Sequence, residues 1–271
     1  MTTPSALLQV MMAAARKAGR RLARDFGEVG ELQVSKKGPG DFVSAADLKA
    51  EEILVEELSK GRPGYGFLAE ERGVVEGTDK THRWIIDPLD GTTNFLHAIP
   101  HFAVNIALER TPVEGGPGTI QAAVTYNPIT NELFWAEKGK GAFINAEKRL
   151  RVSARRQLDE ALIGTGIPFL GRPGHGQFLK ELHQVSQRVA GVRRYGSAAL
   201  DLAYVAAGRF DVFWERGLKP WDSAAGQLLV LEAGGKITSA DGEDFCLDNG
   251  TVLAGNPDLH GPLLERLKAA A

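Results

Sequence analysis

A short apolar strand that runs directly into two carboxylates constrains this chain most. Residues 84–86 are Trp-Ile-Ile, and Asp87, Pro88 and Asp90 follow within four positions. A continuous apolar run of this kind is typical of a buried strand. Pro88 lacks a backbone N–H and restricts the preceding residue to extended conformations, so we expect the strand to stop at Asp87. The sequence therefore predicts two aspartates at the carboxyl end of a core strand.

Asp87 and Asp90 predict one half of a metal site. They lie three residues apart around a tight turn, so their side chains can converge on one point. Two carboxylates held that close need a counter-charge. Mg²⁺ takes oxygen ligands in near-octahedral geometry and keeps several waters, which suits two aspartates, the Leu89 carbonyl and an incoming phosphate better than it suits zinc.

The next three residues predict a phosphate-binding turn. Gly91, Thr92 and Thr93 stand where a helix should begin, with Thr92 or Thr93 as its cap. The free N–H groups of a helix start bind anions. Taken alone, the segment also fits an Asp-rich turn before a capped helix with no ligand at all.

Three further acidic residues occur where elements begin or end. Glu70 follows a short apolar segment and is a further candidate metal ligand. Asp222 precedes a small-residue stretch that predicts a helix over 224–233, so it is either a helix N-cap or a metal ligand. Asp47 stands at the head of an amphipathic helix expected to reach about Lys60, where an acid also complements the helix dipole.

The composition excludes several classes of protein. With 271 residues, 43% of them hydrophobic, the chain can bury one large core or two modest ones. Its net charge of −2 offers no global basic field for nucleic acid or membrane. The single cysteine, Cys246, allows neither an internal disulfide nor a cysteine-based zinc site, which fits a reducing compartment. No stretch approaches roughly 18 uninterrupted apolar residues, so we expect a cytoplasmic protein that does not engage membranes.

The middle of the chain predicts antiparallel sheet. Strands are expected over 102–109, 119–126 and 132–137, with a hairpin turn between the last two, and residues 149–153 are expected to continue the sheet.

The remainder predicts α/β layers and two lobes. From residue 161 onward, strands and helices alternate. We expect a first lobe over residues 1–153 and a second over 154–271. Neither a proline-rich nor a glycine-serine linker separates them, so the lobes should share an interface.

Several of these segments together resemble the inositol monophosphatase family of Mg²⁺-dependent, lithium-sensitive phosphatases. The resemblance spans nearly the whole chain and looks closest to the bacterial branch. It implies a layered αβαβα sandwich with the active site between the lobes. The matching segments are residues 41–47, 70–71, 87–95, 161–169, 194–204, 221–222 and 254–257.

The resemblance also implies a set of metal ligands. Glu70, Asp87 and the Leu89 carbonyl would hold a first Mg²⁺, and Asp87, Asp90 and Asp222 would hold a second. A third, weaker Mg²⁺ near Glu70 is the family expectation. Two such ions can stabilise both the attacking and the leaving oxygens of a phosphoryl displacement.

Catalytic and substrate roles follow from the same resemblance. The attacking water would be deprotonated with help from Glu70 and from Thr92, whose hydroxyl pairs with Asp47. The phosphate and the hydroxyls of a polyol would be bound by Asp90, Gly91, Thr92, Thr93, Gly196, Ala198, Glu215 and Asp222.

Two of these substrate contacts have simpler readings. Glu215 ends a strand expected over 209–214 and could instead be a surface acid that pairs with Arg216, while Gly196 could be only a turn.

The sequence lacks the motifs of two other classes of enzyme. Gly164-Thr165-Gly166 is not followed by the Lys and Ser/Thr of a P-loop, and Gly196-Ser197-Ala198 lacks the second glycine of a serine-hydrolase elbow.

The sequence leaves alternatives for the alcohol part of the substrate and for the protein partners. Thr93-Asn94 favours the inositol type over relatives that act on 3′-phosphoadenosine nucleotides, but histidinol phosphate and fructose 1,6-bisphosphate remain alternatives. Bacterial relatives in this family also serve as partners of the transcription and ribosomal RNA antitermination machinery, so a non-catalytic or second role is an alternative. A homodimer is expected by analogy.

Overall fold

The computed structural model describes residues 3–28, 34–38, 41–146 and 148–270. Its helices are α1 (Ala6–Phe26), α2 (Ala45–Gly61), α3 (Thr92–Leu96), α4 (His175–Ser186), α5 (Ala198–Ala206), α6 (Pro220–Glu232) and α7 (Pro257–Lys268), with 3-10 turns at Leu158–Glu160 and Leu247–Asn249. None of the helices in these described parts is long and apolar enough to cross a membrane.

The strands form two main sheets and one small one. Strands β1 (Val34–Gly38) and β2 (Asp41–Ser44) pair with each other alone. The first main sheet contains β3 (Gly66–Ala69), β4 (Gly73–Val75), β5 (His82–Asp90), β6 (Ala103–Arg110), β7 (Thr119–Asn127), β8 (Glu132–Glu137), β9 (Gly141–Ile144) and β10 (Lys148–Arg149). The second contains β11 (Leu162–Thr165), β12 (Gly191–Arg193), β13 (Val212–Arg216), β14 (Lys236–Thr238) and β15 (Thr251–Gly255).

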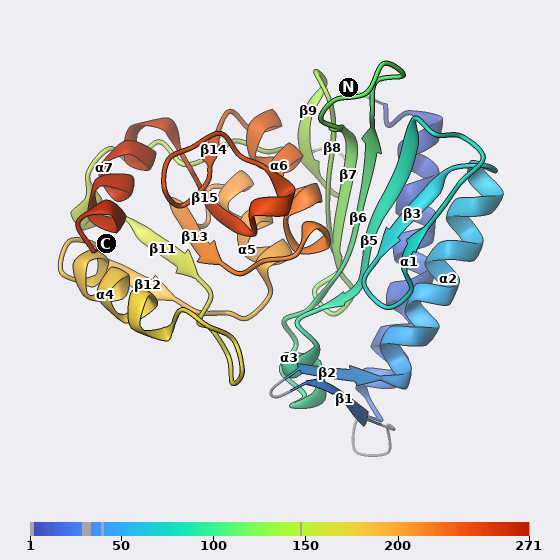
Figure 1. The fold of residues 1–271 in the computed structure, drawn as a ribbon, viewed down its shortest axis with the longest axis horizontal. Helices are drawn as coiled ribbons and strands as arrows, with labels where there is room; N and C mark the ends of the chain where they lie inside the picture. The colour runs from blue at the N-terminus through green and yellow to red at the C-terminus, as the bar shows by residue number, and fades with distance from the viewer. Residues whose placement is uncertain (1–2, 29–33, 39–40, 147, 271) are drawn as a thin grey trace.

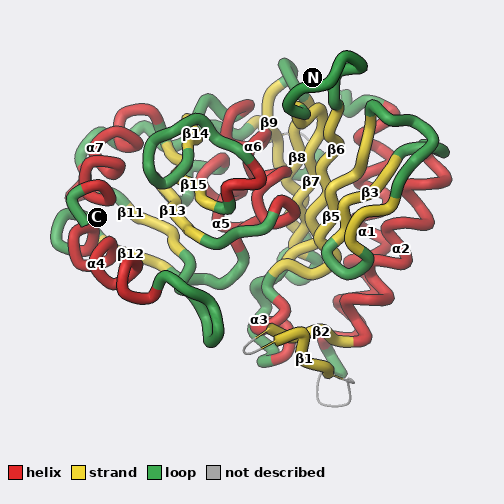
Figure 2. The backbone as a smooth tube through the Cα atoms, viewed as in Figure 1, coloured by secondary structure: helices red, strands yellow, loops and turns green. Residues whose placement is uncertain are grey.

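The elements stack in five layers (Figure 1). Helices α1 and α2 cover the outer face of the first sheet, α5 and α6 lie between the two sheets, and α4 and α7 cover the far side of the second. Figure 2 shows the same alternation of helix and strand across the molecule. The expected αβαβα sandwich is confirmed.

The parallel pairing of β3 and β5 places their carboxyl ends side by side. The first sheet has the order β10-β9-β8-β7-β6-β5-β3-β4, and its neighbours are antiparallel except for the parallel pair β3 and β5. The second has the order β12-β11-β13-β15-β14, with β12, β11 and β13 parallel. Because β3 and β5 run the same way, the residues that follow them emerge at one edge of the sheet.

Burial on both faces explains the unbroken apolar run in β5. Trp84 and Ile86 pack into the core beneath α1 and α2, whereas Ile85 faces the core shared with α5 and α6. Alternate side chains of a strand point to opposite faces, so a strand covered by helices on both sides is apolar throughout.

The expectation that this strand stops at Asp87 is wrong. Strand β5 continues to Asp90, with a shift of register in which Asp87 pairs with Asn105 and Asp90 with Ala103. The extra residue makes a bulge, and a bulge tolerates Pro88 because it requires no ladder N–H there. The bulge keeps both aspartates on paired backbone and turns the chain between them.

Other boundaries also differ from expectation. The strand expected over 209–214 is β13 at Val212–Arg216, so Glu215 lies within it. The continuation expected over 149–153 is limited to Lys148–Arg149. The helix expected over 224–233 begins four residues earlier, at Pro220, because proline is favoured in the first turn of a helix.

Candidate active site

Glu70 is positioned by the parallel pair β3 and β5. Its backbone N–H donates to the Ile86 carbonyl at 3.2 Å, which places it beside Asp87. The turn that follows is held by Glu51 of α2. The Glu51 carboxylate accepts from the Glu71 N–H at 2.8 Å and pairs with Arg72 Nε at 3.2 Å. Sequence reasoning missed Glu51, because an acid inside a helix carries no special signal.

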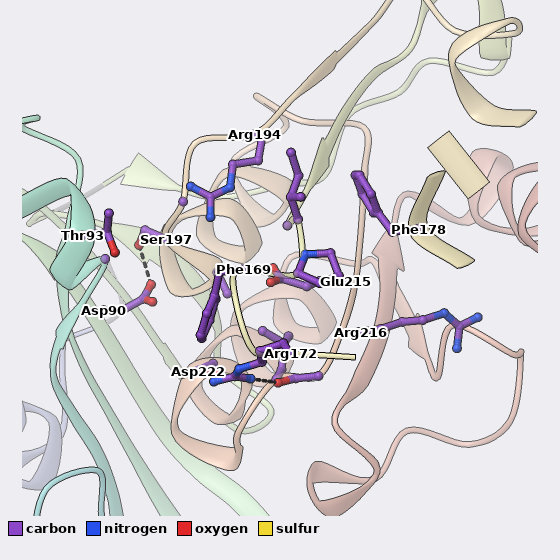
Figure 3. Close-up of a pocket in the computed structure, with 18 of the residues that line it drawn as sticks. Asp90, Thr93, Phe169, Arg172, Phe178, Arg194, Ser197, Glu215, Arg216 and Asp222 are labelled. Atoms are coloured by element: carbon purple, nitrogen blue, oxygen red, sulfur yellow. Dashed lines mark hydrogen bonds between the residues drawn. The ribbon is translucent and has the colours of Figure 1, made fainter. Parts of the chain in front are cut away.

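Asp90 joins the bulge of β5 to the start of α5. Its Oδ2 accepts a short hydrogen bond from Ser197 Oγ and another from the Ala199 N–H at 2.8 Å. Ser197 is also the N-cap of α5. Figure 3 shows the bond between Ser197 and Asp90 across one wall of the pocket. Ser197 was missed as a site residue, although a serine before a small-residue helix is a recognisable cap signal.

Asp222 reaches the same place from α6. The helix is capped at Lys219, whose N–H donates to Asp222 Oδ2 at 2.7 Å, so the N-cap reading of Asp222 is wrong by three positions. The preceding residue is tied to the first sheet, because Asn105 Nδ2 donates to the Trp221 carbonyl at 2.7 Å. Asn105 is itself held by Thr125 Oγ1 at 2.6 Å and is the β6 partner of Asp87. Sequence reasoning did not assign Asn105, although a single asparagine in an otherwise apolar strand could have drawn attention to it.

The carboxylates of Asp87, Asp90 and Asp222 converge. One oxygen from each lies within 4.8 Å of the others. Burial, reinforced by the charges of Glu70, Asp90 and Asp222, raises the pKa of Asp87 well above its usual range. Burial also raises the pKa of Asp90 to about 6 and that of Asp222 well upward, with the Asp90 charge adding to the latter.

This donor set fits a divalent cation. Three hard carboxylate oxygens in a partly buried cluster repel one another, and a cation would relieve that repulsion. The cluster includes neither a thiolate nor an imidazole, so its chemistry suits Mg²⁺ or a similar oxygen-binding ion better than zinc. The acidic cluster can therefore hold a metal ion.

The turn after Asp90 is built on glycine. Gly91 has φ +94° and is the N-cap of α3 without any side-chain cap, so the expected capping by Thr92 or Thr93 is wrong. A Cβ at Gly91 would lie 3.1 Å from the His101 carbonyl oxygen and 3.3 Å from that of Gly196. Only glycine accommodates both this φ and this close approach.

The hydroxyl of Thr92 is directed to groups behind the turn. Its Oγ1 lies 3.2 Å from Asp47 Oδ1 and 3.1 Å from the Leu89 carbonyl, so the expected pairing of Thr92 with Asp47 is present. Asp47 is fully buried in a capping box of α2, where it accepts from the Ser44 N–H at 2.8 Å and from Ser44 Oγ at 2.6 Å. Burial raises the pKa of Asp47 to about 6.

A cavity of about 400 Å³ opens in front of the carboxylates. Asp47 does not line it, and its link to the cavity is the contact with the Thr92 hydroxyl. The other predicted site residues all line this cavity; they are Glu70, Asp87, Leu89, Asp90, Gly91, Thr92, Thr93, Gly196, Ala198, Glu215 and Asp222.

The wall opposite the turn is formed by the second sheet. Glu215 of β13 projects into the cavity, as Figure 3 shows, and burial together with the Asp90 charge raises its pKa to about 8. A Cβ at Gly166 would lie 1.9 Å from Glu215 Cδ, so the glycine makes room for this carboxyl group. The alternative pairing with Arg216 is wrong, because Arg216 pairs with Glu181 and Asp241, each at 2.8 Å.

The same wall carries residues that sequence reasoning did not assign. Phe169, Arg172 and Arg194 line the cavity around Glu215. The Arg172 guanidinium lies 4.4 Å from the centre of the Phe169 ring and donates a hydrogen bond to the Gly217 carbonyl. The segments of Phe169 and Arg194 were recognised and that of Arg172 was not, and nothing in the sequence showed that these side chains turn inward.

Known proteins share both the sequence and this architecture. The profile of the family described as "Inositol monophosphatase family" matches residues 3–270. The inositol-1-monophosphatase of Caulobacter vibrioides is 70% identical over 261 residues, which cover 96% of this chain and 100% of that protein. The Nus factor SuhB of Escherichia coli is 42% identical over 262 residues, which cover 97% of this chain and 96% of that protein.

A solved structure is similarly close. The crystal structure of the extragenic suppressor protein suhB from Bartonella henselae has a TM-score of 0.92 and 56% sequence identity, covering 97% of this chain and 99% of that one. The chain therefore belongs to the inositol monophosphatase family, a family of phosphoric monoester hydrolases.

Proposed function

We propose that this protein is a Mg²⁺-dependent phosphatase that hydrolyses inositol 1-phosphate or a similar polyol phosphate to the alcohol and inorganic phosphate. The observation that carries the proposal is the convergence of Asp87, Asp90 and Asp222 at the floor of a cavity bordered by the Gly91 turn. The name of the Caulobacter vibrioides relative supports inositol 1-phosphate as the first substrate to test.

The ligand roles are assigned to the acids and to one carbonyl. Glu70, Asp87 and the Leu89 carbonyl would hold one Mg²⁺, and Asp87, Asp90 and Asp222 a second, with a third near Glu70. When bound, these ions supply positive charge that lowers the pKa of water and neutralises phosphate oxygens.

Thr92 and Asp47 form a route for a proton. A water beside Thr92 can donate to Oγ1, and Oγ1 can donate in turn to Asp47 Oδ1 at 3.2 Å. Burial raises the pKa of Asp47 to about 6, which suits a group that accepts a proton near neutral pH. Glu70, which also lines the cavity, is the second candidate to help deprotonate the water. Gly91, Thr92 and Thr93 would bind the phosphate oxygens through N–H and hydroxyl groups.

The alcohol would be bound by the wall opposite the turn. Glu215 faces the cavity and can hydrogen-bond to hydroxyls of a polyol, with Asp90, Gly196, Ala198 and Asp222 around it. Hydroxyl-rich alcohols are favoured, because a partly buried carboxyl group left without a partner would cost free energy. Histidinol phosphate, fructose 1,6-bisphosphate and 3′-phosphoadenosine nucleotides remain the alternatives.

The experiment is phosphate release from inositol 1-phosphate and from these three alternatives, with and without Mg²⁺ and Li⁺. We expect the highest kcat/KM with inositol 1-phosphate, no turnover after chelation, and inhibition by Li⁺. Absence of turnover on every substrate in Mg²⁺ would reject the phosphatase proposal.

A second candidate is a role beside the transcription machinery. It rests on the 42% identity to the Nus factor SuhB of Escherichia coli. Co-purification of transcription complexes with an Asp90→Asn variant would show such a role in the absence of phosphatase activity. We also propose a cytoplasmic homodimer, and light scattering of the purified protein tests the dimer.

A further inference from the structure

Asn94 joins the loop after its own helix to a second loop about a hundred residues further along the chain. It lies in α3 and is 6% exposed. Its Nδ2 donates to the Tyr195 carbonyl at 2.7 Å and to the His101 carbonyl at 2.8 Å, and lies 3.5 Å from the Gly196 carbonyl. The side chain therefore connects the Gly91 turn to the loop between β12 and α5.

The end of this loop, where α5 begins, is held at a second point. Four residues before Asn94, Asp90 accepts from Ser197 Oγ and from the Ala199 N–H. Segment 195–199 is thus fixed to the Gly91 turn at both of its ends. The turn and the segment touch between these points, since a Cβ on Gly91 would lie 3.3 Å from the Gly196 carbonyl oxygen.

The two parts joined in this way hold different parts of the proposed substrate. The Gly91 turn faces the phosphate, whereas Gly196 and Ala198 border the space for the alcohol. We propose that Asn94 is a positioning residue that sets the alcohol-binding segment 195–199 at its distance from the phosphate-binding turn. This inference rests on the proposed function for its substrate, but the contact itself does not.

The chemistry requires an amide at this position. An NH₂ group has two hydrogens for two carbonyl acceptors, whereas an ionised aspartate has none and would face those carbonyls with negative charge. Asn94→Asp keeps the shape and removes the donor. Asn94→Ser is a milder second variant, because a short hydroxyl can donate to only one of the carbonyls.

The matched control is Asn256→Asp. Asn256 is 1% exposed, and its Nδ2 donates to Ser153 Oγ at 2.8 Å and to the Arg155 carbonyl at 3.1 Å. Aspartate there also loses an amide donor but keeps the oxygen that caps α7 by accepting from the Leu259 N–H. Asn256 does not line the cavity, so this variant reports the cost of losing a buried amide elsewhere.

The first measurement is hydrogen exchange of the peptide that covers residues 195–200, in Mg²⁺ and without substrate. We expect faster exchange there in Asn94→Asp and Asn94→Ser, and unchanged exchange in Asn256→Asp. Exchange at the wild-type rate in both Asn94 variants would overturn the inference. This readout needs no turnover, so it decides on the contact even if the proposed phosphatase function fails.

The second measurement compares inositol 1-phosphate with p-nitrophenyl phosphate, which has no hydroxyls for the alcohol wall. We expect kcat/KM for inositol 1-phosphate to fall about tenfold more than that for p-nitrophenyl phosphate, the scale of one lost hydrogen bond. An equal fall on both substrates would show a merely structural role and overturn the positioning role. Asn256→Asp should leave the ratio of the two substrates unchanged.

Discussion

At the scale of single residues, Asp90 has two different tasks. One of its oxygens, Oδ2, accepts from Ser197 and Ala199 of the second half of the chain, while the carboxylate also faces Asp87 and Asp222. The hydrogen bonds lower the pKa of Asp90, but burial outweighs them. An asparagine can keep the two hydrogen bonds and cannot supply the charge.

We therefore expect Asp90→Asn to remove activity without unfolding the protein. Phosphate release should fall by about 100-fold, the order seen when one preorganised charge contact is lost from an active site. The melting temperature in metal-free buffer should stay equal or rise, since one of three repelling charges is gone. Circular dichroism and phosphate assays measure the two effects. Normal turnover by this variant would show that Asp90 is not a metal ligand.

Glu215 predicts a pH dependence of stability. Burial raises its pKa from 4.5 to about 8, so the folded state holds a proton that the unfolded state releases at lower pH. The stabilisation is complete below the unfolded pKa and is lost as the pH rises through the folded one. The free energy of unfolding in metal-free buffer should therefore fall between about pH 5 and 8.

Glu215→Gln should flatten that decline, because glutamine does not titrate. Denaturant unfolding at several pH values measures it. Glu243→Gln, at an exposed acid, is the control and should leave the slope unchanged. If both variants keep the wild-type slope, Glu215 does not carry a raised pKa in solution.

Single residues differed in how far the sequence could predict them. Asp87, Asp90 and Glu70 follow short apolar segments, and that pattern alone marked them as candidate ligands, whereas their shared sheet edge follows from the parallel pairing of β3 and β5. The inward orientation of Arg172 and Phe169 depends on a loop between β11 and α4, and loop conformation has no periodic signal in sequence. Glu51 and Asn105 act through neighbouring backbone, which only the fold reveals.

At the scale of elements, helix α6 is fixed by close packing against α5. A Cβ on Gly226 would lie 2.4 Å from Leu202 Cδ1. The helices can be this close only because the position is glycine. Asp222 lies one turn earlier on the same helix. The spacing between α5 and α6 therefore also sets the distance of its carboxylate from Asp87 and Asp90.

Gly226→Ala should therefore destabilise the protein by about 1–3 kcal/mol, the usual cost of overpacking a core. Activity should fall as well, because α6 carries Asp222. Gly176→Ala in α4 is the matched control, since a Cβ there meets nothing within 4 Å and alanine favours a helix. Chemical denaturation of the two variants gives the comparison. Equal stability in both would mean that the α5–α6 contact relaxes without cost.

The sequence pattern predicted most helices and strands, but it predicted their first and last residues less accurately. Strand β8 was predicted over 132–137, as observed, because alternation and a flanking turn mark both ends. The bulge in β5 was missed, since Pro88 marks a break in pairing but does not show that pairing resumes at Asp90. Whether a ladder resumes depends on the neighbouring strand, which local sequence does not contain.

At the scale of the whole molecule, the acidic cluster joins the first sheet to the helical layer between the two sheets. Asp87 and Asp90 lie at the end of β5 in the first sheet, while Asp222 lies in the first turn of α6, the helix between the sheets. Mg²⁺ bound by all three should stabilise the fold as a whole. At a free concentration about 100 times Kd, the expected gain is about 2.7 kcal/mol.

Thermal unfolding with increasing Mg²⁺ measures this gain, and chelation should reverse it. Asp222→Asn should reduce the rise in melting temperature, whereas Asp258→Asn, at an exposed acid, should not. A melting temperature independent of Mg²⁺ would contradict the assignment of this cluster as the metal site.

The middle layer also bears on how the chain can be divided. Helix α6, from the second half of the sequence, packs on β5, β6, β7 and β8 of the first. Helix α5 is buried along nearly its whole length. A cut near residue 153 would therefore strip the inner face of the first sheet and leave two apolar helices in water. The pieces would be complementary fragments that regain activity only when mixed, and gene fusions or insertions should target the molecule's outer loops instead.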